Sequence, residues 1–130
     1  MNLYVADTHA LYWYRTGSPK LGSAAKRAFD EGARGEAIIL VPAIVLAELY
    51  FLNEKAGSPL NFRAELDRWR EAAQFVFVAF DADHVTDFDA DAAVTEMHDR
   101  IIVGVARRLN AFLITRDKSM SENAEVDVTW

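Results

Sequence analysis

The stretch MHDRIIVGVARRLNAFLITRD, residues 97–117, contains a helix pattern, a stop and a strand pattern in direct succession. Apolar residues within 101–109 recur at the spacing that places them on one face of a helix. Asn110 is a plausible end for that helix, and 111–114 form an apolar run typical of a buried strand. The stretch therefore predicts a helix that leads into a buried strand, with Asp117 shortly after the strand.

The same alternation of strands and helices extends through the rest of the chain. We predict strands at 3–6, 38–41 and 75–80 and a final edge strand over 126–130. The spacing predicts helices at 9–15, 21–29, 42–55 and 62–73, and a weakly patterned helical segment at 81–96. Strands that alternate with helices indicate an α/β fold whose parallel sheet is covered on both faces.

Composition limits the class of protein. The 130 residues are enough for one domain, which we expect to span 1–130. The absence of cysteine excludes a disulfide scaffold, a thiolate metal site and a cysteine nucleophile. We find no membrane-length apolar run and no signal-peptide pattern, so we expect a cytoplasmic protein. The net charge of −6 counts mildly against simple binding to nucleic acid.

Acidic residues lie near the ends of the predicted strands. Asp7 follows the first strand, Asp117 follows the strand at 111–114, and Asp99 begins the helix that leads into that strand. In parallel sheets, functional groups gather beyond the carboxyl ends of the strands. Taken singly, Asp7 and Asp99 are also explicable as helix caps and Asp117 as a turn residue.

Glu48 is a different case, because every other residue from 43 to 52 is apolar or aromatic. A helix that is apolar on nearly all sides is expected to be buried, and a buried carboxylate needs a cation. That cation is either a metal ion or an arginine such as Arg100 or Arg116. Several acids without cysteine or a suitable histidine pair favour Mg²⁺ or Mn²⁺ over zinc.

Three blocks of the sequence resemble the PIN-domain family, in particular the VapC-type toxins of toxin–antitoxin pairs. They are YVADTHALYWY, VPAIVLAELYFL and MHDRIIVGVARRLNAFLITRDKSM, in the order in which that family carries them. The resemblance implies a three-layer α/β/α fold around a parallel sheet of four to five strands. It also implies an endoribonuclease in which Asp7, Glu48, Asp99 and Asp117 hold Mg²⁺ or Mn²⁺ around a nucleophilic water. The partners implied are an RNA substrate, a VapB-like antitoxin and a second copy of the chain, with no membrane.

Other residues near the acids receive supporting roles. The family commonly carries a serine before its second acid, but the matching stretch here, 41–45, has no hydroxyl. Thr8 and Thr115 are the remaining hydroxyls, and Thr115 is the better candidate for holding water or a ligand carboxylate. Arg100, Arg116 and Lys118 flank two of the acids and are candidates for contacts with RNA phosphates. Arg107 and Arg108 are interpreted as a solvated helix face.

Two other functions remain open. A phosphoacceptor signalling domain of receiver type also uses Mg²⁺ and clustered aspartates, with Asp81 as the candidate acceptor and Lys118 as its partner. Only Asp7 follows the first strand, however, where such a domain needs paired acids. The second alternative is a non-catalytic binding module in which the acids form salt bridges.

Overall fold

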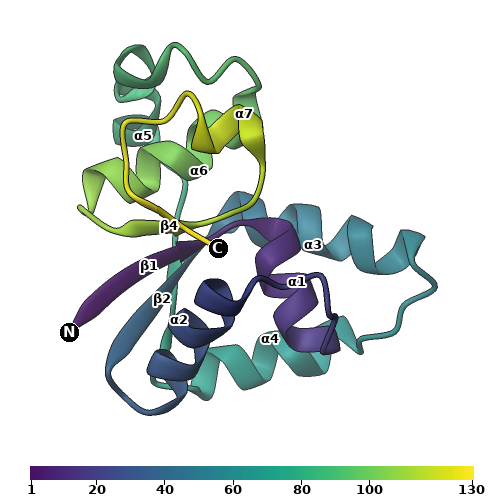
Figure 1. Cartoon of the computed structure of the whole chain (residues 1–130). Helices are drawn as coiled ribbons and strands as arrows, with labels where there is room; N and C mark the ends of the chain where they lie inside the picture. Colours follow the sequence, from purple (N-terminus) through teal and green to yellow (C-terminus); the bar gives the residue numbers. More distant parts are fainter.

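A parallel sheet of five strands, in the order β3-β2-β1-β4-β5, forms the centre of the fold (Figure 1). The computed structural model describes residues 1–130. All neighbouring strands pair in parallel, so the predicted parallel α/β architecture is confirmed. The strands are β1 (Asn2–Ala6), β2 (Ala37–Pro42), β3 (Phe75–Val78), β4 (Phe112–Ile114) and β5 (Val128–Thr129).

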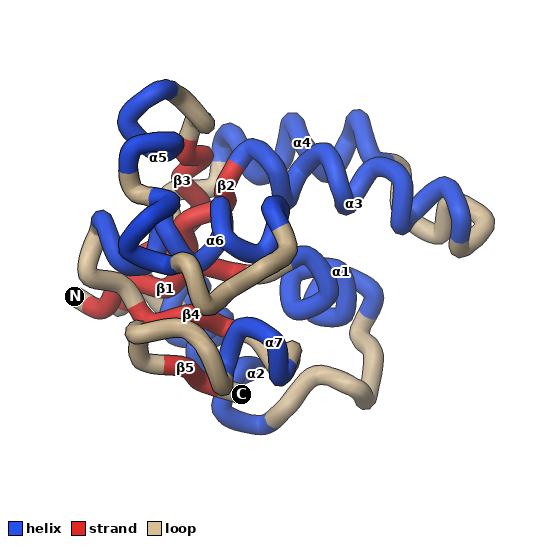
Figure 2. The backbone as a smooth tube through the Cα atoms, turned by 90° about the horizontal axis from the view of Figure 1, so that it is seen from above, coloured by secondary structure: helices blue, strands red, loops and turns tan.

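Helices cover both sides of this sheet, and Figure 2 shows them in blue around the red strands. In Figure 1, α6 lies with α5 and α7 on one side, and α2 lies with α1 and α4 on the other. The helices are α1 (Thr8–Thr16), α2 (Ser23–Ala33), α3 (Ala43–Lys55), α4 (Phe62–Glu71), α5 (Ala82–Thr86), α6 (Met97–Arg108) and α7 (Lys118–Ser121), with a 3₁₀ turn at Phe88–Asp91. No helix is both long and apolar enough to cross a membrane.

The central position of β1 follows from its side chains. Val5 and Ala6 are fully buried, and Val5 pairs with Leu40 of β2 on one side and Leu113 of β4 on the other. A strand without polar side chains in its second half is stable only where both faces and both edges are covered. The first strand in sequence is therefore the middle strand in space, and the residue after it, Asp7, emerges at the centre of the sheet's edge.

Three elements differ from their predictions. The strand predicted at 75–80 ends at Val78 and lies at the edge of the sheet, where Val76 is 43% exposed. The acidic segment 81–96 forms only α5 and the 3₁₀ turn. The short helix α7 was not predicted, because four residues are too few to produce a periodic pattern. Asn110 does end α6, with the positive φ of 51° that asparagine tolerates.

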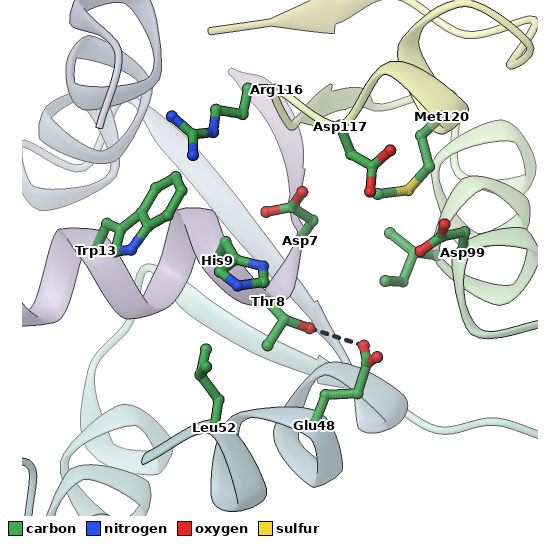
Figure 3. A pocket seen from close by; sticks show the side chains of 11 residues that line it. Asp7, Thr8, His9, Trp13, Glu48, Leu52, Asp99, Arg116, Asp117 and Met120 are labelled. Carbon is green, nitrogen blue, oxygen red and sulfur yellow. Dashed lines mark hydrogen bonds between the residues drawn. The ribbon is translucent and has the colours of Figure 1, made fainter. Parts of the chain in front are cut away.

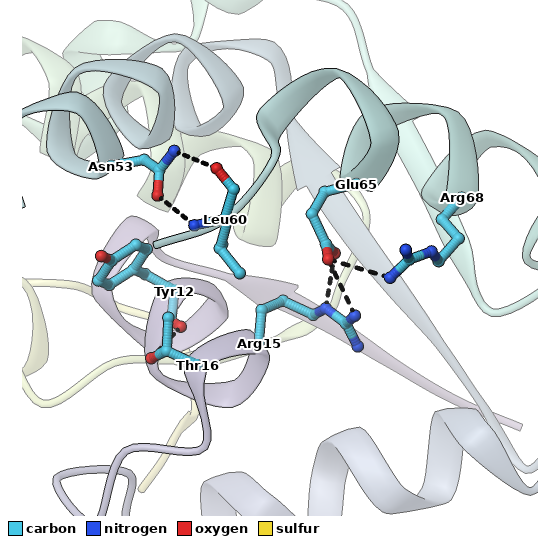
Figure 4. Close-up of polar contacts among 7 residues, drawn as sticks. All are labelled: Tyr12, Arg15, Thr16, Asn53, Leu60, Glu65 and Arg68. Carbon is cyan, nitrogen blue, oxygen red and sulfur yellow. Dashed lines mark hydrogen bonds and ion pairs between the residues drawn. The ribbon is translucent and has the colours of Figure 1, made fainter. Parts of the chain in front are cut away.

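Two sets of polar contacts hold α1, α3 and α4 in place (Figure 4). Glu65 of α4 is buried, and it accepts hydrogen bonds from Arg15 of α1 at 2.9 Å and Arg68 at 3.1 Å. Asn53 of α3 bonds both backbone groups of Leu60, at 2.8 and 3.0 Å. These contacts fix α1 and α3, which begin at the edge of the sheet where the acids lie.

Candidate functional site

A pocket of about 490 Å³ opens at the carboxyl ends of β1 and β4. All four predicted acids line it, and Figure 3 shows their side chains around a common space. They reach it from four different elements or loops, which explains why their positions in sequence are so far apart. The lining residues are Asp7, Thr8, His9, Trp13, Glu48, Leu52, Asp99, Ile102, Arg116, Asp117 and Met120.

Asp7 is the most buried of the four acids, with 6% of the residue exposed. Its Oδ1 accepts a hydrogen bond from the backbone N–H of Ala10 at 2.8 Å, so Asp7 also caps α1. The Thr115 hydroxyl donates to its Oδ2. Burial raises the pKa of the Asp7 carboxyl despite these hydrogen bonds, and the negative charge of Asp117 raises it further. No lysine or arginine side chain compensates for this charge.

Glu48 is less enclosed than its apolar helix predicts. Its side chain is 31% exposed, and α3 buries only one narrow face, leaving Tyr50 and Phe51 47% and 67% exposed. Neither Arg100 nor Arg116 pairs with it. The Thr8 hydroxyl donates to Glu48 Oε1 at 2.8 Å, and His98 Nδ1 lies 3.3 Å from Oε2. The expectation of a fully buried charge is therefore wrong, because α3 packs along one stripe and leaves the rest of its surface open.

Asp99 and Asp117 share one hydroxyl. Ser119 Oγ lies 2.6 Å from Asp117 Oδ1 and 3.1 Å from Asp99 Oδ2. Burial raises the pKa of the Asp99 carboxyl, and the charges of Asp117, Glu96 and Glu48 raise it further. Asp99 is not a helix cap, because Glu96 caps α6 and accepts a hydrogen bond from the Asp99 backbone.

Of the three basic residues predicted to contact RNA, Arg116 alone lines the pocket. The Arg100 guanidinium donates to the backbone carbonyls of Val94 and Ala92, so it holds the segment before α6. Lys118 is exposed on α7. Arg107 is likewise not part of a solvated face, because it forms an ion pair with buried Asp91.

The donor set fits a hard divalent cation by chemistry and by charge. Carboxylate and hydroxyl oxygens surround the pocket, and two of the acids have pKa values raised by burial and by neighbouring negative charges. A bound cation would relieve both effects. As the side chains stand, no three acidic or histidine groups converge closely enough to hold a metal ion. A cation held directly by three of these groups would require side chains such as Glu48, which Thr8 and His98 now orient, to rotate.

Ser119 and Trp13 were not predicted to contribute to the site in these ways. Ser119 lies two positions after Asp117, where a serine at the start of a helix carries no distinctive signal in the sequence. The aromatic run at 12–14 favours packing, with Trp13 the likeliest of the three to lie at an interface. Trp13 is buried, and its ring also lines the pocket beside Arg116. Only the folded chain brings these residues together.

Comparison with known proteins identified one family and several solved structures of similar fold. The profile of the PIN domain family matches residues 4–126. A search of curated proteins found no match.

Among solved structures, VapBC2 of Rickettsia felis bound to a promoter DNA fragment is similar at 17% identity, with a TM-score of 0.71, covering 97% of this chain and 96% of that one. FitAcB of Neisseria gonorrhoeae is 17% identical, with a TM-score of 0.64 and coverage of 96% and 95%. A toxin-antitoxin complex from Klebsiella pneumoniae is 20% identical, with a TM-score of 0.62 and coverage of 91% and 88%. At these identities the likeness is one of fold.

Proposed function

This chain belongs to the PIN domain family, whose members are nucleases, and on that basis we propose that it is a Mg²⁺- or Mn²⁺-dependent endoribonuclease. We further propose that it acts as the toxin of a type II toxin–antitoxin pair. One observation carries the catalytic part of the proposal. Four carboxylates line one pocket, and no lysine or arginine forms an ion pair with any of them.

In this proposal Asp7, Glu48, Asp99 and Asp117 hold the cation. A divalent cation in such a site withdraws charge from phosphoryl oxygens and lowers the pKa of water. Thr115 and Ser119 orient the carboxylates of Asp7, Asp99 and Asp117 through their hydroxyls. Thr8 orients Glu48.

The attacking water must also lose a proton. The cation lowers the pKa of this water, and a carboxylate of the pocket accepts the proton. Leu52, Ile102 and Met120 form the apolar part of the wall and limit access of bulk water.

The proposed protein partner is supported by a solved structure and by the surface next to the pocket. The Klebsiella pneumoniae neighbour is a toxin-antitoxin complex, which favours an antitoxin as the partner here. Exposed Tyr50 and Phe51 follow Glu48 on the same helix and offer apolar surface close to the pocket. We also expect a homodimer, which light scattering would test.

The receiver alternative is disfavoured by the strand order. Receiver domains have the order 2-1-3-4-5, which places the third strand next to the first. Here β2 separates β3 from β1, so Asp81 after β3 is remote from Asp7. Asp81 caps the short helix α5 and is exposed.

The alternative of a non-catalytic binding module requires salt bridges to the acids. No lysine or arginine forms such a bridge with Asp7, Glu48, Asp99 or Asp117, so this alternative is disfavoured as well.

The test of the proposed function is cleavage of labelled single-stranded RNA by the purified chain with Mg²⁺ or Mn²⁺. We expect Asp99→Asn to lower the rate at least about 100-fold, as expected when a ligand to a catalytic cation is removed. Asp67→Asn, an exposed acid on α4, is the matched control and should cleave normally. Wild-type rates for Asp99→Asn, or cleavage that resists EDTA, would contradict the proposal.

The toxin role has its own test. Induced expression should arrest growth, and Asp99→Asn should relieve the arrest. Co-expression of a short reading frame neighbouring the gene should also relieve it if that frame encodes the antitoxin. Normal growth during expression of the active wild-type chain would contradict the toxin role and leave the nuclease activity standing.

A further inference from the structure

An acidic pocket needs a separate surface to attract a nucleic acid, and half of the basic residues of this chain are already engaged in other contacts. Six of the 14 lysines and arginines form ion pairs with carboxylates: Arg15, Lys26, Arg34, Arg68, Arg107 and Arg108. Arg100 donates to backbone carbonyls. Among those that remain, only Arg116 lines the pocket.

Arg116 is held in an unusual way. Its guanidinium carbon lies 4.4 Å from the centre of the Trp13 ring, and no carboxylate pairs with it. Lys20 Nζ lies 5.7 Å from the same ring centre. Two positive charges thus share one aromatic ring immediately beside the pocket. With its carbon over the ring and no carboxylate paired with it, the Arg116 guanidinium keeps N–H donors available to a phosphate.

The Trp13 ring is held in place by two aromatic neighbours. Trp130 packs edge-on against Trp13 at 5.9 Å, and His9 packs against it at 5.2 Å. Trp130 in turn lies so close to Gly22 that a Cβ there would come within 2.6 Å of it. Trp13 is only 9% exposed, so its ring is fixed by packing. The side chains of Arg116 and Lys20 next to it form the accessible surface.

The charges of the pocket are arranged on two sides. In Figure 3, Arg116 and Trp13 lie on one side, Asp99 and Met120 lie on the other, and Asp7 lies between them. The acidic side is extended by Glu96, whose charge raises the pKa of Asp99. A polyanion therefore meets repulsion from the Asp99 side and attraction from the Arg116 side.

We propose that Trp13, Arg116 and Lys20 form a strand-binding platform that positions single-stranded RNA beside the acidic pocket. Arg116 contacts the phosphate next to the scissile one, and the outer face of its guanidinium accepts a stacked base. Lys20 contacts the backbone further from the pocket. This proposal rests on the proposed nuclease function and adds the direction from which the strand enters.

The preference for a single strand follows from burial. The scissile phosphate must approach Asp7, which is 6% exposed at the base of the pocket. A single strand can bend so that one phosphate enters this recess, whereas stacked base pairs hold a duplex straight. Stacking on an arginine plane likewise requires a base that is free of its complement.

The experiment compares Arg116→Ala and Lys20→Ala with Arg63→Ala, an exposed arginine on α4 that neither lines the pocket nor forms an ion pair. Arg116 is exposed, so its substitution should leave the fold intact. We expect Arg116→Ala to raise KM for single-stranded RNA about tenfold while kcat changes little. The slope of log affinity against log salt concentration should fall by about the amount expected for one lost phosphate contact. Arg116→Lys should restore the salt dependence but only part of the affinity, because lysine lacks the planar face.

Binding without cleavage separates this proposal from the nuclease proposal. Labelled RNA is titrated into Asp99→Asn and into Asp99→Asn with Arg116→Ala, using fluorescence anisotropy. Loss of affinity on adding Arg116→Ala supports the platform even if no variant cleaves RNA. If the wild type cleaves RNA but Arg116→Ala has the KM of Arg63→Ala, the platform is wrong and the nuclease function stands. Equal affinity for duplex and single-stranded RNA would overturn the single-strand assignment.

Discussion

Thr115 donates a hydrogen bond from its hydroxyl to Asp7, although the two residues are 108 positions apart. The same oxygen accepts the backbone N–H of Asp117 at 3.0 Å, so Thr115 orients two acids. We expect Thr115→Val to weaken Mn²⁺ binding by about 10–100-fold, the usual effect of removing a group that orients a metal ligand. Thr115→Ser keeps the hydroxyl and should bind nearly as the wild type does. Calorimetric titration measures this, and equal affinities for the valine and serine variants would contradict the role.

Asp7 should reduce the stability of the metal-free protein. Its pKa is raised in the folded state, so ionisation at neutral pH favours unfolding. We expect Asp7→Asn to be more stable than the wild type in urea at pH 7, because it removes the buried charge and keeps a side chain that can cap α1. Saturating Mn²⁺ should stabilise the wild type and not the variant. Greater stability of the metal-free wild type would show that the hydrogen bonds to Asp7 outweigh its burial.

Arg107 and Asp91 form a pair whose disruption should be costly. The Asp91 side chain is 1% exposed, and its Oδ2 has no hydrogen-bond partner, so Arg107 is its main compensation. We expect Arg107→Met to lower the free energy of unfolding by about 3–5 kcal/mol, because it leaves a buried charge unpaired. The double variant with Asp91→Leu should recover most of that loss. Urea denaturation of the set tests this, and additive losses in the double variant would argue against the pairing.

Tyr4 gives the protein a dependence on alkaline pH. Its hydroxyl donates to Glu31 at 2.5 Å, and burial together with this carboxylate raises the Tyr4 pKa to about 12. A raised folded-state pKa stabilises the protein below the ordinary value of 10.0, and that contribution is lost as the pH rises towards 12. Tyr4→Phe should therefore show a smaller loss of stability between pH 10 and pH 12, the interval between the ordinary and the raised pKa. Parallel slopes for the two proteins would contradict the assignment.

The sequence was informative wherever a pattern repeats within one element. The helix over 101–109 and the strand at 111–114 were both confirmed, because apolar spacing is determined locally. The edge position of β3 was not predictable in this way. Its residues 75–78 are as apolar as those of a buried strand, and their exposure depends on which strands become neighbours.

The candidate site divides along the same line. The pattern of acids near strand ends predicted that Asp7, Asp99 and Asp117 lie together, and all three line the pocket, since parallel strands end at one edge. The contacts among them were not predictable, because Ser119 with Asp99 or Arg116 with Trp13 depends on how loops and helices pack. Arg100 was predicted to contact RNA beside the site, but its guanidinium binds backbone carbonyls instead. It is adjacent to Asp99 in sequence, but on a helix the next residue points in a different direction.

The strand order also determines when the site can exist. β1 is made first, but its neighbour β4 and the residues Thr115 and Asp117 come near the other end of the chain. A chain emerging from the ribosome therefore has Asp7 and Glu48 long before it has the groups that complete the pocket. Contacts between distant positions also form late in folding. A nascent chain thus carries no assembled centre until Thr115 and Asp117 have been made, and on the proposed nuclease function it cannot cleave the messenger that encodes it before then.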